Sequence, residues 1–138
     1  MTSQPGGQPS TVPTRHPHAR QRKFRQAAFV YLHVGILYEV AVVVLWQQGI
    51  LPTDRGPVAI WLVLGAAIVG LVFWGLWTWQ NRWFARIIWA IHGMRLPALI
   101  GGAFFPAAAA AIPESFYLTA LIVVLINLWM LARAGWDL

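Results

Sequence analysis

Hydrophobic residues gather in four long runs along this chain, separated by short segments that carry Pro, Gly and charged residues. The runs cover about residues 27–48, 58–79, 96–112 and 114–133. A helix needs about 20 apolar residues to cross the hydrocarbon of a bilayer, with about 17 as the short limit. Three runs meet this length, and the third is short and contains Pro97 and Pro106. The pattern predicts an all-α bundle of four transmembrane helices.

The stretch before the third run, residues 81–95, admits two interpretations. Arg82 and Arg86 share one face of a helix, and apolar side chains gather on another. Either the third span begins near Trp83 and carries its arginines in the headgroup layer, or the stretch is a separate amphipathic helix on the membrane surface. Because Gly93 and Pro97 would bend the chain into the bilayer, we favour the surface helix. Both alternatives give four spans.

Composition agrees with a membrane protein and argues against several function classes. Hydrophobic residues make up 59% of the chain and charged residues 10%, whereas soluble domains carry about 25% charged residues. The absence of cysteine excludes disulfides and thiolate chemistry. No Ser–His–acid set, pair of carboxylates on one helix, phosphate loop or HExxH motif is found, so we do not expect an enzyme.

The positive charges lie on one side of the predicted spans. Nine of the ten Lys and Arg residues precede the first span, separate the second from the third, or follow the fourth, and only Arg55 lies on the other side. The positive-inside rule therefore predicts a bacterial-type inner-membrane protein with both termini in the cytoplasm. Residues 1–26, rich in Pro and Gly and then basic, are expected to form an extended or disordered tail before an uncleaved first span.

Basic and aromatic residues at this side are expected to meet anionic lipid headgroups rather than nucleic acid, because they flank apolar spans. Tryptophan rings also favour this boundary. The predicted interface set is Arg22, Lys23, Arg25, Arg82, Arg86, Arg95, Arg133, Trp77, Trp79 and Trp83.

Polar residues interrupt the first and fourth spans: His33, Tyr38, Glu39, Thr119 and Asn127. At about 1.5 Å per residue, His33 and Asn127 each lie roughly 9 Å from the basic side, while Glu39 and Thr119 lie roughly 18 and 21 Å from it. Matching depths predict that the first and fourth spans are neighbours. The matching depths also predict two polar side-chain pairs between these spans. One joins His33 to Asn127, and the other joins Glu39 to Thr119 or to a tyrosine hydroxyl.

Glu39 and His33 each raise a functional hypothesis. A carboxylate in hydrocarbon costs several kcal/mol, so we expect Glu39 to be protonated at rest or to face a partner or water, as in a proton-coupled transporter or channel. In span number and in this first-span acid, the chain is similar to small four-span multidrug exporters, and the likeness is confined to these two features. His33 is a candidate ligand for haem or a chlorophyll-type pigment, although no cofactor is predicted. His92 is expected to lie too close to water for that role.

Small residues form the most extended pattern. Ala66, Gly70 and Gly75 in the second run, and Ala98 and Gly102 in the third, are spaced so that helix backbones can approach closely. Together with bound lipids, such faces favour docking against other membrane protein subunits. The leading hypothesis is therefore a non-catalytic accessory subunit of a larger membrane complex, respiratory or photosynthetic (reaction-centre or antenna type), with transport and pigment binding as alternatives.

Overall fold

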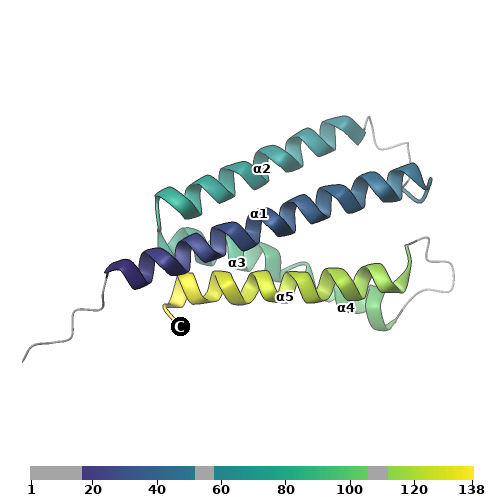
Figure 1. Ribbon diagram of the computed structural model, residues 1–138. Coiled ribbons are helices and arrows are strands. Elements are labelled where there is room, and N and C mark those ends of the chain that lie inside the picture. The colour runs from purple at the N-terminus through teal and green to yellow at the C-terminus, as the bar shows by residue number, and fades with distance from the viewer. Residues whose placement is uncertain (1–16, 52–57, 106–111) are drawn as a thin grey trace, which may run out of the picture.

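The computed structural model describes residues 17–51, 58–105 and 112–138 and is helical through most of them. Its helices are α1 (Pro17–Gln47), α2 (Val58–Thr78), α3 (Arg82–Gly93), α4 (Leu96–Phe104) and α5 (Glu114–Trp136), as Figure 1 shows. Four segments within the described residues are long and apolar enough to cross a membrane: His18–Gln47, Val58–Thr78, Arg82–Phe104 and Glu114–Trp136. The prediction of an all-α bundle with four spans is confirmed.

The helix α1 begins earlier than the first hydrophobic run. Residues 17–26, predicted as part of an extended tail, form its first turns, and the rest of that predicted tail lies outside the described residues. Phe24 explains the difference, because its side chain is fully buried among the other helices. Burial of one large aromatic side chain stabilises such a helix start by roughly 2–3 kcal/mol.

The helices α1 and α5 lie side by side at the centre of the bundle (Figure 1). The helix α2 packs on α1, with Gly35 facing Val69, and α3 and α4 pack one after the other along α5. The first and fourth spans are therefore neighbours, as their matching polar layers predicted. Contact between α2 and α3 is confined to one end, where Phe84 covers Gly75.

The third span follows the interpretation that we did not favour. The helix α3 packs lengthwise on α5 instead of lying on the membrane surface, and it buries Ala85, Ile88 and His92. Its apolar face points outward, with Trp83 69% and Met94 75% exposed. The bundle therefore takes the face that carries Ala85, Ile88 and His92, and the face with Trp83 and Met94 is left for lipid.

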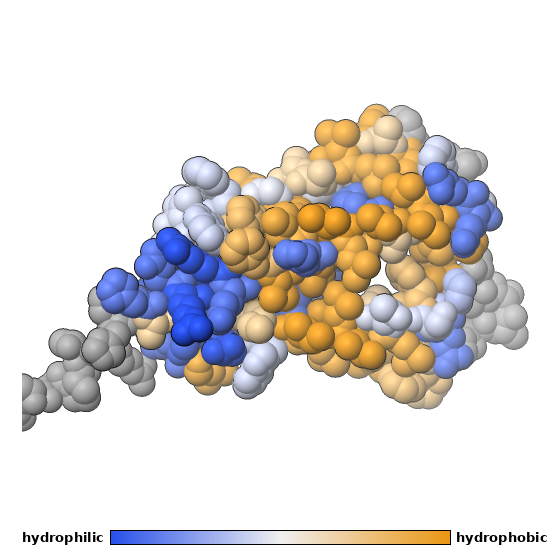
Figure 2. Space-filling view, viewed as in Figure 1, coloured by the Kyte–Doolittle hydropathy of each residue, from blue (hydrophilic) through white to orange (hydrophobic). Residues whose placement is uncertain are grey.

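Most of the buried core gathers at one end of the bundle. We call it the basic end and define it by Arg20, Lys23, Arg82, Arg86 and Asp137. Figure 2 shows a dense hydrophilic cluster here, a smaller one at the opposite end, and hydrophobic surface between them. The buried side chains of this core come from every span: Phe24, Ala27, Ala28, Tyr31, Val72, Leu76, Ala85, Ile88, Leu131 and Ala134.

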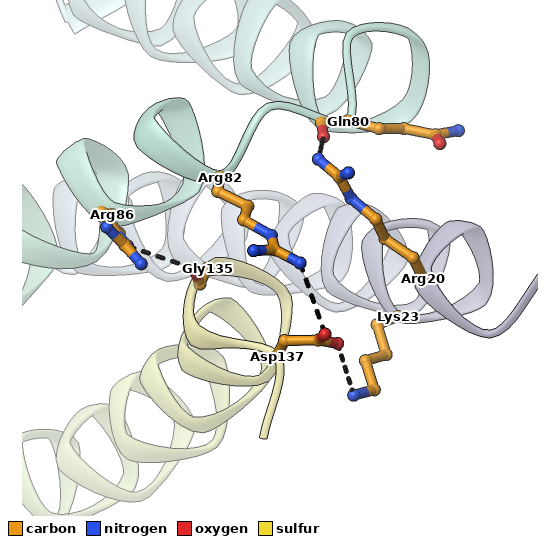
Figure 3. A network of polar contacts seen from close by, with 7 residues as sticks. All are labelled: Arg20, Lys23, Gln80, Arg82, Arg86, Gly135 and Asp137. Carbon is orange, nitrogen blue, oxygen red and sulfur yellow. Dashed lines mark hydrogen bonds and ion pairs between the residues drawn. The ribbon is translucent and has the colours of Figure 1, made fainter. Parts of the chain in front are cut away.

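Polar contacts tie the helices together at the basic end (Figure 3). Asp137 accepts Lys23 Nζ at 2.9 Å and a terminal nitrogen of Arg82 at 3.4 Å, which links α1, α3 and the end of α5. Arg20 donates to the Gln80 carbonyl at 3.0 Å, just past α2. Arg86 Nε donates to the Gly135 carbonyl at 3.1 Å. Every span is thus held at this end by at least one charged hydrogen bond.

We expect Asp137→Asn to lower stability, because it removes the carboxylate that Lys23 and Arg82 share. The expected loss is on the order of 1 kcal/mol, or about 3–5 °C in thermal unfolding. Differential scanning fluorimetry of the purified protein in mild detergent measures this shift. Arg22→Gln is the matched control, since Arg22 is exposed beside Lys23. Equal unfolding temperatures for Asp137→Asn and the control would contradict the role of the shared carboxylate.

Candidate functional site

A cavity of about 240 Å³ opens between α1, α2 and α5, and several of its lining residues, among them Tyr38, Ile68 and Arg95, are exposed. It begins above the buried core and extends toward the far end, where Figure 2 shows a hollow between the α1 and α5 sides of the molecule. Most lining residues are apolar, among them Val34, Leu37, Ile68, Val69, Val123 and Val124. Its polar lining consists of Tyr31, Tyr38, His92, Arg95 and Thr119.

These polar residues form two layers. Tyr31 and His92 make the lower layer, nearest the basic end, with their ring centroids 5.2 Å apart. Tyr38 and Arg95 belong to the upper layer, where the guanidinium carbon lies 5.8 Å from the centroid of the tyrosine ring. Tyr31 and Tyr38 are seven residues apart on α1, so they share a face about 10 Å apart along the axis.

Arg95 lies near the middle of the third span rather than in the headgroup layer where we expected it. It follows Arg82 by thirteen residues and precedes Phe104 by nine, which places it roughly 20 Å and 14 Å from the two ends of a span that crosses about 30 Å of hydrocarbon. The displacement follows from the span beginning at Arg82 and not at Leu96. The ion pairs formed among the described residues do not include Arg95.

The break between α3 and α4 positions this arginine. Gly93 ends α3, and Arg95 is the N-cap residue of α4, which carries a proline in its first turn. Proline is tolerated there because the first amides of a helix have no intrahelical acceptor. The third span therefore has two helical halves, and Arg95 lies between them at the cavity wall.

Glu39 faces α2 and not α5. A Cβ atom placed on Gly65 would collide with Glu39 Oε1, so the carboxyl group lies directly against the α2 backbone where Gly65 lines the cavity. Thr119 donates its hydroxyl to the Ser115 carbonyl at 2.8 Å. The predicted pair of Glu39 and Thr119 is thus not formed. The two residues lie near the same level but on different walls.

Asn127 and His33 do not pair either. Asn127 is fully buried, and neither its Nδ2 nor its Oδ1 has a hydrogen-bond partner. His33 Nδ1 lies 2.7 Å from the Phe29 carbonyl, which makes Nδ1 the donor and leaves Nε2 as an acceptor. His33 is exposed and lines an outer groove between α1 and α5 with Val34 and Val123. The predicted pair of His33 and Asn127 is not formed, because a shared depth does not determine which way a side chain points around the helix.

The outer groove is the place where a tetrapyrrole would meet the Nε2 atom of His33. No group of three or more His, Cys, Asp or Glu residues that could hold a metal occurs within the described ranges. His92, which we expected near water, is instead buried, with Nδ1 3.0 Å from the Ile88 carbonyl. Pigment or haem binding through His33 stays a prediction.

The predicted packing residues fall into two groups. Gly75 packs against Phe84, and Gly102 packs against the ring of Tyr117 on α5. Ala66, Gly70 and Ala98 lie on outward faces, and no described atom beyond the local backbone approaches a Cβ position on Gly70 within 4 Å.

The predicted interface residues lie at the basic end, with Arg95 as the exception. The Arg25 guanidinium stacks 4.8 Å from the Trp77 ring, and that of Arg86 lies 5.1 Å from the rings of both Trp83 and Trp136. Arg22 and Trp79 are exposed, and Arg133 is partly exposed. Lys23 and Arg82 have Asp137 as a partner inside the protein, so less of their charge faces headgroups than we expected.

Sequence reasoning did not identify Tyr31, His92 or Gly65 as cavity residues. A signal existed for Tyr31, because its seven-residue spacing from Tyr38 places both on one helix face. A signal for His92 was hidden by the assignment of residues 81–95 to the membrane surface. Comparison of the chain with models of protein families, with curated proteins and with solved structures finds no match.

We expect Asn127→Leu to stabilise the protein. A buried amide without partners costs about 1–3 kcal/mol, and leucine has nearly the same size without polar atoms. The unfolding temperature in detergent should therefore rise by several degrees, as measured by scanning fluorimetry. The exposed neighbour offers a control, because Ile126→Leu should leave the unfolding temperature nearly unchanged. A fall on Asn127→Leu would mean that the amide makes stabilising interactions, for instance with internal water.

Proposed function

We propose that this protein is a small membrane carrier that binds a solute in its central cavity and exchanges a proton at Glu39. The observation that carries the proposal is the placement of two charged side chains near mid-membrane without an ion pair among the described residues: Arg95 lines the cavity, and Glu39 lies against the α2 backbone at Gly65, which lines it. A charged residue at the centre of a transmembrane helix costs about 2.5–3.5 kcal/mol on insertion scales, and such residues commonly mark substrate or proton pathways.

The interrupted third span supports this proposal. Solute sites in many transporters lie near the bilayer midplane, where helices are broken and backbone or side-chain polar groups face a cavity. Here the break between α3 and α4 brings Arg95 to the cavity wall. The backbone stays paired across the break, because the amides of Met94 and Arg95 donate to the carbonyls of Ala90 and His92.

The two ends of the bundle differ in a way that fits a carrier. Toward the basic end, the side chains of Phe24, Leu76 and Leu131 are fully buried, and in the proposed carrier their packing closes the path. Toward the far end the cavity continues between α1, α2 and α5. With the basic end on the cytoplasmic side of a bacterial-type inner membrane, as the positive-inside rule favours, this form is open away from the cytoplasm.

We expect Glu39→Gln to abolish coupled proton movement, because glutamine cannot bind and release a proton. The protein is reconstituted in vesicles that contain a pH-sensitive dye, and small solutes are added outside under a fixed membrane potential. Wild-type vesicles should show solute-dependent pH changes above those of protein-free vesicles, and Glu39→Gln vesicles should match the protein-free level. Arg22→Gln serves as the control and should retain the wild-type signal. Equal signals from wild type and Glu39→Gln would contradict the proposal.

An accessory subunit of a larger membrane complex is the second candidate. The observation in its favour is the pair Ala66 and Gly70 on the outward face of α2, where the protein's own helices leave Gly70 uncovered. Small residues four apart let a helix of another subunit approach closely. On this alternative the basic N-terminal segment contacts the complex at the cytoplasmic surface.

We expect Gly70→Leu to distinguish the two functions. In an accessory subunit the added side chain would separate the helices and release the protein from its complex, as seen by native gel electrophoresis of membranes in mild detergent. A carrier that works alone should keep its proton signal and its mobility. Gly101→Leu is the matched control, because Gly101 also faces open space but has Pro97 and Phe105 four residues away.

A further inference from the structure

We infer that the cavity binds a small amphipathic monocarboxylate, with the acid group on Arg95 and the apolar body between α1, α2 and α5. The inference deepens the proposed function by naming its solute class, and it rests on the same cavity. The ligand class can also be correct if the protein binds such an acid without transporting it.

The charge of the cavity lining determines the sign of the charge that the ligand carries. Arg95 is the charged residue among those that line the cavity, and the other polar lining residues are Tyr31, Tyr38, His92 and Thr119. Its guanidinium carries no ion pair among the described side chains and stacks instead on the ring of Tyr38. The planar guanidinium group has paired N–H donors that match the two oxygens of a carboxylate.

The single cation of the lining limits the ligand to one negative charge. Arg95 is the charged residue of the lining, and the carboxyl group of Glu39 lies outside the lining, against the α2 backbone at Gly65. A dianion such as a phosphate monoester would keep one charge without a partner in a largely apolar cavity. The single charge of a monocarboxylate is neutralised by Arg95.

Size and lining chemistry define the rest of the ligand. A volume of about 240 Å³ equals roughly eight water molecules of the liquid, which suits one aromatic ring or a short branched chain and not a two-chain lipid. Val34, Leu37 and Ile68 are among the apolar residues that would cover this body. A cavity of this kind binds an apolar body with few orienting polar groups.

The test uses 4-(trifluoromethyl)benzoate as the probe and the full chain in nanodiscs of zwitterionic lipid. Fluorine NMR follows the bound fraction as the probe concentration rises. Wild type should show saturable binding, and Arg95→Met should weaken it by at least about tenfold, since the charged hydrogen bonds are lost. Arg95→Lys should lie between the two. Arg133→Gln, far from the cavity, should bind like wild type.

Two further arms keep the test decisive. The neutral probe 4-(trifluoromethyl)benzyl alcohol should bind wild type at least about tenfold more weakly than the acid. Ala120→Phe fills the cavity while leaving Arg95 in place, and it should also abolish binding. All variants are compared by size-exclusion chromatography and thermal unfolding, so that loss of fold is separated from loss of the site.

The proposal is overturned by unsaturable binding to wild type, by equal affinity of Arg95→Met, or by equal affinity for the neutral alcohol. Tighter binding of 4-(trifluoromethyl)phenylalanine than of the simple acid would replace the class with amino acids. Loss of probe binding when the same experiment is repeated in discs that contain anionic lipid would assign Arg95 to a lipid headgroup. Glu39→Gln should still bind the probe. Binding without proton movement would therefore reject the carrier function and keep the ligand class, and the reverse result would reject the ligand class alone.

Discussion

A charge placed inside a bilayer must find a partner, and this constraint organises the whole bundle. At the basic end it is met by short charged contacts, in which Asp137 accepts Lys23 and Arg82 while backbone carbonyls accept Arg20 and Arg86. These contacts bring the ends of all spans together and seal a core around Phe24. In the middle of the membrane the same constraint is met only in part, by the ring of Tyr38 and the backbone at Gly65. The unmet part is the basis of the anion site proposed above.

The division between a closed end and a hollow middle has a simple structural cause. Small and aromatic residues alternate across the helices at the basic end, so Ala27, Ala28 and Ala85 let large side chains fill the space between them. Farther along, α2 packs on α1 and α4 packs on α5, and these two pairs meet where α1 lies beside α5. No described helix closes the space between α2 and α4. The cavity therefore lies beyond the closely packed core at the basic end, where the small residues are concentrated, and beside the break between α3 and α4.

Hydropathy was enough to predict the four spans, since lipid selects long apolar helices whatever their neighbours. Counting at 1.5 Å per residue was also enough to place the first and fourth spans side by side. Direction around the helix axis was not accessible in this way. Glu39 faces α2 and His33 faces outward, so neither forms the side-chain pair that its predicted depth suggested. The lengthwise packing of α3 on α5 was missed for a related reason: an amphipathic pattern states which faces differ, and not whether water, lipid or protein lies against each one.

Tyr38 and Glu39 are adjacent in the sequence, but their side chains point in different directions. Adjacent residues of a helix point about 100° apart, so Tyr38 turns toward the cavity and Arg95 while Glu39 turns toward α2. If Arg95 and Glu39 had formed an ion pair, each charge would have been neutralised by the other. Glu39 would then not bind a proton readily, and Arg95 would not bind an anion readily. In the proposed carrier, the separation of the two side chains leaves Arg95 available to an anion and Glu39 available to a proton. An anion on Arg95 would in turn favour a proton on Glu39, because the second negative charge becomes harder to hold in the same low-dielectric layer. Coupling between solute and proton would then follow from placement alone, without a moving part between the two groups.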